Sequence, residues 1–279
     1  MAARGKRPTA WICAGCSSPA TRWRAQCAVC HGWNLLIAAQ QAAALGLALP
    51  VTMIPEPKVK RWPTGIESVD RALGGGVAQG LSMVISGLPG CGKSTLLAQW
   101  LGAVARRHAA VYITIEESVD MLRSRVGRLG LADRDRLLLV QKRTLPEVQA
   151  MIERTNAAAV VVDSADKLAR RSGVRAEAIV DQLTQLAHEC SAAVWIPAHV
   201  NKQLDRSPRE KIAGSMSEQH DGDVVAWLDG DPAVSTDREL ILLKNRGGPS
   251  HLRAPLVMTE SGLVAAATNV IPIRPGMSP

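Results

Sequence analysis

Aromatic residues are scarce in this chain of 279 residues, which contains no Phe, a single Tyr and seven Trp. Apolar residues nevertheless make up 47% of the sequence, so a full hydrophobic core can be built. Aliphatic side chains and the Trp residues must fill that core. The length is enough for one large α/β domain with a small appendage, and it is too short for two large domains.

The sequence also lacks a strong candidate for a membrane span. Residues 35–54 have the required length, but they contain Gln40, Gln41 and Pro50 and are dominated by Ala, so insertion would be weak at best. We interpret this segment as a linker with a helical first half. No secretory signal is visible, because no cleavage site follows the first apolar stretch. We therefore expect a cytoplasmic protein without a membrane partner.

Acidic residues are almost missing from the beginning of the chain. Up to Arg61 the sequence has eight basic residues and one acid, Glu56, which gives a local charge of +7 out of a formal net charge of +8. Basic N-terminal segments commonly approach phosphate backbones. An arm that only increases solubility fits the same composition.

Four of the six cysteines form a tight N-terminal group. Cys13 and Cys16 form one Cys-x-x-Cys pair, and Cys27 and Cys30 form a second pair after ten intervening residues. Two such pairs supply four thiolates to one metal in a tetrahedral shell, which suits Zn²⁺. A haem-attachment pattern ending at His31 and a redox-active pair are the alternatives. The second pair and the missing export signal favour structural zinc in a reducing cytosol.

A glycine-rich loop is the most informative motif of the chain. Residues 87–95 match G-x-x-x-x-G-K-[ST] completely, and they lie between an apolar run at 81–85 and a helix-like stretch at 96–101. In this context, backbone N–H groups and the helix N-terminus bind phosphates, so the motif predicts a nucleotide site. The loop residues are Gly87, Leu88, Pro89, Gly90, Cys91, Gly92, Lys93, Ser94 and Thr95.

Charged and hydroxyl residues have expected roles around this loop. Lys93 should reach the β- and γ-phosphates of ATP, and Ser94 should ligate Mg²⁺. Asp163 ends the apolar run at 160–162, where it can hold the Mg²⁺ shell beside the loop. Glu116 or Glu117 ends another strand and could polarise the attacking water. Alternatively, these two acids only stabilise the N-terminus of the following helix, where negative charge is favourable.

Apolar, β-rich runs alternate with amphipathic helical patterns after the linker, which predicts an α/β fold with a mostly parallel sheet. The last strands have no helices between them, and this indicates an antiparallel extension at one edge. Expected strands beyond 81–85 are 110–115, 137–140, 159–162, 192–196, 224–228 and 239–243. Expected helices include 119–129 and 174–189.

With these residues assembled, the chain resembles the RadA (Sms) DNA-repair ATPase family, a bacterial branch of the RecA-like group. The resemblance covers roughly residues 6–34 and 61–263. Its most specific parts are the cysteine module with the sequence Arg-Trp-Arg-Ala-Gln-Cys-Ala-Val-Cys-His-Gly-Trp-Asn at 22–34, and Leu-Gly-Gly-Gly at 73–76. Residues 112–118, 128–131, 198–202 and 228–231 follow the same family pattern.

The resemblance implies an organisation in four parts. We expect a four-cysteine zinc module at 8–34, a linker at 35–60, a RecA-like P-loop ATPase core at 61–263 and a Pro-containing tail at 264–279. Family members usually continue into a domain resembling the Lon protease, which is thought to scaffold a ring. The sequence ends at Pro279. We expect either a truncated form, such as one from a mobile element or phage, or oligomerisation through the ATPase domain alone.

The family signature Lys-Asn-Arg-Phe-Gly is present as residues 244–248, with Gly247 in place of the Phe. In the family these basic residues are thought to act across a subunit interface on the neighbour's nucleotide. Lys244 and Arg246 are therefore candidate catalytic residues, and an Arg supplied in trans is worth roughly 10³–10⁵ in rate. A solvated basic turn is the alternative.

The resemblance further implies a homo-oligomeric, hexameric ring that acts on single-stranded and branched DNA while hydrolysing ATP, with a recombinase as a candidate partner. Lys202, Arg206, Arg209 and Lys211 lie where related ATPases present a DNA-contacting loop. His199 could sense the γ-phosphate, and a buried structural role is equally open. The alternatives for the whole chain are a RecA-like ATPase that acts on proteins and a helicase loader or accessory.

Overall fold

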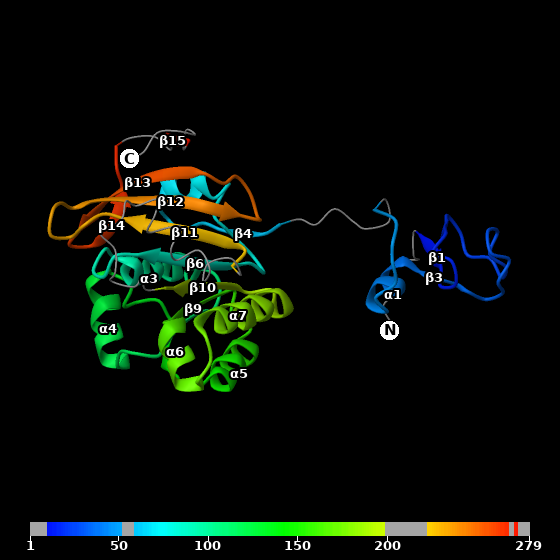
Figure 1. Cartoon of the computed structure of the whole chain (residues 1–279), viewed down its shortest axis with the longest axis horizontal. Helices are drawn as coiled ribbons and strands as arrows, with labels where there is room; N and C mark the ends of the chain where they lie inside the picture. The colour runs from blue at the N-terminus through cyan, green and yellow to red at the C-terminus, as the bar shows by residue number, and fades with distance from the viewer. Residues whose placement is uncertain (1–9, 52–58, 199–221, 268–270, 273–279) are drawn as a thin grey trace. The chain divides into compact units, whose positions relative to one another are not determined.

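The computed structural model describes residues 10–51, 59–198, 222–267 and 271–272. The chain divides into two compact units, Met1–Lys58 and Val59–Pro279 (Figure 1). Each unit is described by itself. No helix in the described part is long and apolar enough to cross a membrane.

The N-terminal unit contains a small antiparallel sheet in the order β2-β1-β3. Its strands are β1 (Trp11–Cys13), β2 (Pro19–Ala20) and β3 (Leu36–Ala38), and α1 (Ala39–Ala44) follows directly. Cys13, Cys27 and Leu36 form its small core. Both β3 and α1 lie within the segment expected as a linker, so ordered structure continues beyond the cysteine pairs.

The second unit is built on a sheet whose strand order is β14-β13-β12-β11-β6-β10-β9-β7-β8, with β15 paired to β13. Six neighbouring strands are parallel. They are β6 (Ser82–Gly87), β7 (Ala110–Thr114), β8 (Leu137–Gln141), β9 (Ala159–Asp163), β10 (Ala193–Pro197) and β11 (Val224–Asp229). Each expected strand from 81–85 to 224–228 corresponds to one of them, which confirms the mostly parallel sheet.

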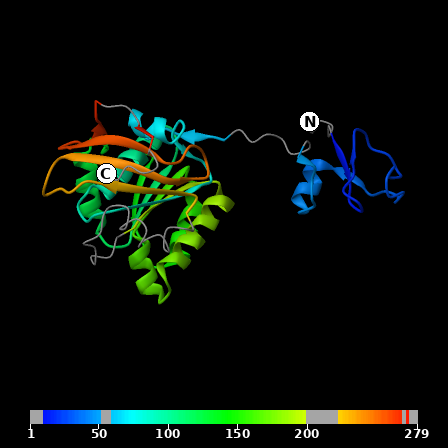
Figure 2. The ribbon, with the colours of Figure 1, turned by 45° about the horizontal axis from the view of Figure 1, so that its top comes forward.

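The remaining strands form the antiparallel extension that the sequence predicts. They are β12 (Asp237–Asn245), β13 (Leu252–Thr259), β14 (Gly262–Ala265) and the short β15 (Ile271–Pro272). Figure 2 shows the yellow-to-orange strands together along one side of the unit. A separate pair, β4 (Arg61–Trp62) and β5 (Val77–Ala78), precedes the large sheet in the sequence.

Helices cover both faces of the large sheet. One face packs against α2 (Glu67–Ala72), α3 (Lys93–Val104) and α4 (Val119–Arg128). The other packs against α5 (Leu145–Thr155), α6 (Ala165–Ser172) and α7 (Ala176–Cys190). Along β6, Met83 and Ile85 join the first core and Val84 joins the second, because successive strand residues point to opposite faces. The helices α4 and α7 match the expected ranges, whereas α5 and α6 were not predicted.

The Trp residues fill the core only in part. Trp100, Trp195 and Trp227 are at most 1% exposed, and the rings of Trp100 and Trp195 meet edge to face at 5.6 Å. In contrast, Trp23 and Trp33 of the N-terminal unit are exposed. The expectation that all Trp residues are core residues is therefore wrong for this pair, because both lie outside the small core of Cys13, Cys27 and Leu36.

Candidate nucleotide and metal sites

The glycine loop joins the carboxyl end of β6 to α3, whose first turn carries Lys93, Ser94 and Thr95. Gly87 has φ 156°, and a Cβ there would overlap the carbonyl oxygen of Leu228. Gly92 precedes the helix with φ 112°, in the left-handed region that favours glycine. The loop therefore needs glycine at both positions, and this conformation leaves the N-terminus of α3 facing the loop.

Lys93 is held inside the loop and is only 5% exposed. Its Nζ donates hydrogen bonds to the carbonyl oxygens of Gly87 at 2.7 Å and Leu88 at 3.0 Å. Burial lowers the pKa of Lys93 from its ordinary value, while the nearby Cys91 and Asp163 act in the opposite direction. The loop thus carries a desolvated ammonium group that can be drawn to a phosphate.

Asp163 lies at the carboxyl end of β9, directly beside the first turn of α3. Its Oδ2 accepts hydrogen bonds from the Ser94 hydroxyl at 2.8 Å and from the Tyr112 hydroxyl at 2.5 Å. Burial, followed by the neighbouring Asp163, raises the pKa of Tyr112 well above its ordinary value, so Tyr112 stays a donor. The structure therefore places Ser94 and Asp163, the two residues predicted to hold Mg²⁺, side by side, and it adds Tyr112 to the candidate site.

The two adjacent acids after β7 have different surroundings. Glu116 Oε1 accepts a hydrogen bond of 2.6 Å from the hydroxyl of Ser164, the residue that follows Asp163. Glu117 Oε1 forms an ion pair of 2.6 Å with Arg125 on α4. Glu116 therefore lies beside the Ser94–Asp163 pair, while Glu117 is engaged with the helix.

Arg238 on β12 is a second residue that sequence reasoning missed. It is 5% exposed, and its Nε donates to the carbonyl oxygen of Cys91 at 2.9 Å, in the middle of the glycine loop. Its Nη1 donates to the carbonyl oxygens of Ser235 and Asp237. The strand carries other charged residues, such as Asp237 and Glu239, so no local signal in the sequence marks Arg238. Arg238 fastens the loop to the antiparallel part of the sheet.

Lys244 and Arg246 lie at the opposite edge of the sheet from their own glycine loop. Asn245 pairs with Val224 at the beginning of β11, and Val224 pairs with Met83 near the beginning of β6. The loop follows the other end of β6, and a six-residue strand spans about 17 Å. Neither cation can therefore contact a nucleotide bound at the loop of the same chain.

A buried carboxylate anchors this basic turn. Asp223, whose side chain is 2% exposed, pairs with Arg246 Nη1 at 3.1 Å and with His188 Nε2 at 2.8 Å. Its Oδ2 also accepts from the backbone N–H of Ser82 at 3.0 Å. Burial alone raises the pKa of Asp223, but the Ser82 N–H, His188 and Arg246 outweigh it and lower the pKa below its ordinary value. Lys244 Nζ donates to the Gly222 carbonyl at 2.7 Å.

The four N-terminal cysteines converge, with all of their Sγ atoms within 4.8 Å of one another. The Sγ atoms of Cys13 and Cys30 are 3.6 Å apart, and those of Cys16 and Cys27 are 3.8 Å apart. A tetrahedral shell with Zn–S bonds of about 2.3 Å has sulfur–sulfur edges of about 3.8 Å, so the arrangement fits zinc. The Ser18 hydroxyl and the N–H groups of Cys30 and Val29 lower the pKa of Cys27 to about 5.

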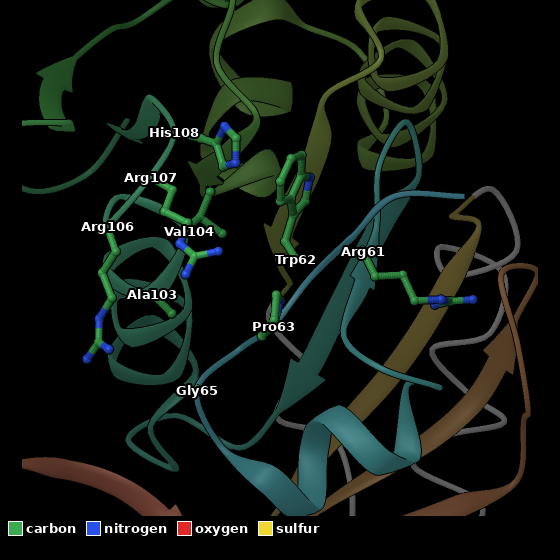
Figure 3. A pocket seen from close by; sticks show the side chains of 9 residues that line it. All are labelled: Arg61, Trp62, Pro63, Gly65, Ala103, Val104, Arg106, Arg107 and His108. Atoms are coloured by element: carbon green, nitrogen blue, oxygen red, sulfur yellow. The ribbon is translucent and has the colours of Figure 1, made fainter. Parts of the chain in front are cut away.

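Some expected site residues are outside the described part of the chain. These are His199, Lys202, Arg206, Arg209 and Lys211. A cavity of about 440 Å³ lies at the C-terminal end of α3, which is remote from the glycine loop (Figure 3). It is lined by Trp62 and His108, whose rings are 4.5 Å apart, and by Arg107. None of the described site residues lines it.

Comparisons with known proteins identify relatives of this chain. The family described as the KaiC ATPase matches residues 62–137. Proteins named DNA repair protein RadA from Escherichia coli K12, Aquifex aeolicus VF5 and Helicobacter pylori 26695 are 31%, 30% and 30% identical to this sequence, over 94%, 93% and 94% of the chain. This chain is a RadA-like protein. It spans 60% to 61% of the length of these three relatives.

The fold of the RadA-like chain also has a counterpart among solved structures. A KaiC-like protein from Pyrococcus horikoshii OT3 superposes with a TM-score of 0.60 and 20% sequence identity. The match covers 75% of this chain and 99% of that protein. At this identity the likeness concerns the fold, and it supports the predicted RecA-like core.

Proposed function

We propose that this RadA-like chain is an ATP hydrolase that acts on single-stranded and branched DNA in DNA repair. The observation that carries the proposal is the hydrogen bond of 2.8 Å between Ser94 and Asp163 beside a complete phosphate-binding loop. The two residues are 69 positions apart in the sequence, yet they offer oxygen ligands at one point, as a Mg²⁺–ATP site requires.

In the proposed reaction, the loop N–H groups and Lys93 hold the phosphates of ATP, while Ser94 and Asp163 hold Mg²⁺. Bound there, Mg²⁺ would neutralise charge that develops on the transferred phosphoryl group. Tyr112 keeps the Asp163 carboxylate in place. Glu116 orients the attacking water and accepts its proton, because Glu117 is already paired with Arg125.

We further propose that the chain works as a homo-oligomer, in a hexameric ring. Lys244 and Arg246 lie too far from their own loop to serve it, whereas a neighbouring copy can offer its loop to them. The Arg246 side chain is 60% exposed, so its charge is accessible to such a neighbour. In this arrangement it stabilises the γ-phosphate as it departs.

DNA contact through Lys202, Arg206, Arg209 and Lys211 is part of the same proposal, as is a recombinase partner. The match to the KaiC ATPase family favours one rival, an ATPase that acts on protein partners. Binding to single-stranded DNA that weakens with salt supports the DNA proposal, and no such binding supports the rival. ATP-driven branch migration or strand displacement separates a motor from a helicase loader.

The direct test of the ATP site is Lys93→Ala, with Lys60→Ala as a control at an exposed lysine outside the site. We expect Lys93→Ala to abolish ATP turnover while the melting temperature stays near that of the wild type. Lys60→Ala should retain full turnover. Turnover that survives Lys93→Ala in a folded protein would contradict the assignment of the active site.

A further inference from the structure

Two indole rings of the N-terminal unit face solvent. Trp23 is 52% exposed and Trp33 is 65% exposed. Single exposed apolar residues are common on protein surfaces and need no explanation. Two exposed Trp residues in one small unit do call for an explanation, because Trp100, Trp195 and Trp227 of the same chain are almost completely buried.

Trp33 belongs to the ribbon that carries the second cysteine pair, and Trp23 lies just before the first strand of this ribbon. The N–H of Cys27 donates to the carbonyl of Gly32 at 2.9 Å, and the N–H of Asn34 donates to that of Ala25 at 2.5 Å. Trp33 lies opposite Gln26 in an antiparallel bridge, and Gln26 follows closely after Trp23 in the sequence. Because Cys27 and Cys30 belong to the four-thiol cluster, a bound metal would hold the base of this ribbon in place.

The surroundings of the rings are strongly basic. Arg22 and Arg24 flank Trp23, and both are exposed. Within the described residues, neither guanidinium has a hydrogen bond or an ion pair with the rest of the chain. The sequence contains no Asp or Glu before Glu56. The segment from Arg22 to Trp33 consequently combines exposed aromatic rings with cations that have no acidic partner among the described residues.

We propose that Arg22, Trp23, Arg24 and Trp33 form a binding surface for single-stranded nucleic acid. Unpaired bases stack on the two indole rings, and the guanidinium groups bind the phosphates between them. Trp and Arg are also frequent in protein interfaces. The absence of any acid before Glu56 favours a polyanion, since a surface that binds proteins generally presents charges of both signs.

This inference goes beyond the proposed function, which assigns DNA contact to basic residues at 202–211. It also stands without ATP hydrolysis, because the surface is made by the N-terminal unit alone. Substituting Lys202, Arg206, Arg209 and Lys211 with Ala tests the former assignment, and substitutions at the Trp residues test this one. The two can therefore fail separately.

The test uses the full chain loaded with zinc and a fluorescently labelled oligo-dT, with affinity measured by anisotropy at fixed salt. Stacking on an aromatic side chain is worth about 1–3 kcal/mol per base, so we expect Trp23→Ala and Trp33→Ala each to weaken binding about tenfold. Val29→Ala is the matched control, because Val29 is 66% exposed in the same ribbon and offers no aromatic face. It should bind like the wild type.

Conservative variants keep the test independent of folding. Trp33→Phe retains a ring and should bind within about threefold of the wild type, whereas Trp33→Leu retains only apolar bulk and should bind as weakly as Trp33→Ala. Both should keep the wild-type zinc content. Equal affinity of the Phe and Leu variants would overturn the stacking role.

Salt dependence tests the two arginines. For single strands, each phosphate contact contributes about 0.7 to the slope of log K against log salt, so Arg22→Gln with Arg24→Gln should reduce the slope by about 1.4. An unchanged slope would contradict the phosphate contacts. Wild-type affinity of both Trp→Ala variants would remove nucleic acid as the partner and leave a protein surface in its place.

Discussion

The two edges of the large sheet carry charged groups in opposite ways. At the carboxyl edge, Lys93 donates to two carbonyl oxygens of the glycine loop, and Ser94 donates to Asp163. At the amino edge, Asp223 is buried while its partner Arg246 remains 60% exposed. The first edge can bind a nucleotide, and the second presents a cation to something outside the chain. In the proposed ring, a second copy completes the site by placing its glycine loop beside this cation.

Among the substitutions considered, Arg246→Ala should cause the largest loss of ATP turnover. Loss of an Arg that stabilises the departing phosphate costs about 10³–10⁵ in turnover, while nucleotide affinity stays near normal because the charge matters mainly in the transition state. ATP turnover and equilibrium binding of a labelled nucleotide measure the two effects. A drop in affinity with unchanged kcat would instead place Arg246 in ordinary ligand binding.

The acids after β7 allow a sharper test of the carboxyl edge. Glu116→Gln should lower kcat by about 10²–10⁴, since a positioned general base contributes that much. Glu117→Gln is the matched control. It removes the charge from an ion pair with Arg125 and should change stability slightly and turnover much less. A larger loss of kcat in Glu117→Gln than in Glu116→Gln would instead make Glu117 the residue that activates the attacking water.

Asp223→Asn tests how the amino edge holds its cation. A hydrogen bond to a charged group contributes about 1.5–3 kcal/mol, and partial exposure of Arg246 reduces this, so we expect a loss of about tenfold in kcat with little change in KM. Combined with Arg246→Ala, it should cost no further turnover, because the two residues act as a unit. Additive losses would mean that Asp223 acts on folding alone.

Cys27→Ser should have the smallest effect on the reaction. Zinc, measured by metal analysis, should fall from one per chain to well below one, because a neutral hydroxyl replaces a thiolate ligand. ATP turnover in the absence of DNA should remain near normal, since the cysteines and the glycine loop belong to separate units. Haem absorbance, or a reduced wild type without metal, would rule against the zinc site.

Contiguous motifs made much of the fold and of the nucleotide site predictable. The glycine loop at 87–95 and the apolar runs that became β6 to β12 carry their signal within a few residues. Asp163 was predictable because it ends such a run, and parallel strands end at one edge of a sheet. The helices α5 and α6 were missed, although α5 begins with a capping box between Thr144 and Glu147.

The residues that sequence reasoning missed make their contacts across long sequence separations. Asp223 meets Ser82 over 141 positions, and Arg238 meets Cys91 over 147. Tyr112 reaches Asp163 only because β7 and β9 are neighbours in register. None of these partners leaves a local pattern. The division of cations between the two edges of the sheet likewise became visible only with the strand order.

The most direct test of a divided site is to mix Arg246→Ala with Lys93→Ala protein. Each variant alone should be inactive, but a mixed assembly contains interfaces that combine an intact loop from one variant with an intact Arg246 from the other. The account predicts that turnover returns in part and is highest near equal proportions. No recovery at any mixing ratio, together with a monomeric protein in solution, would contradict it.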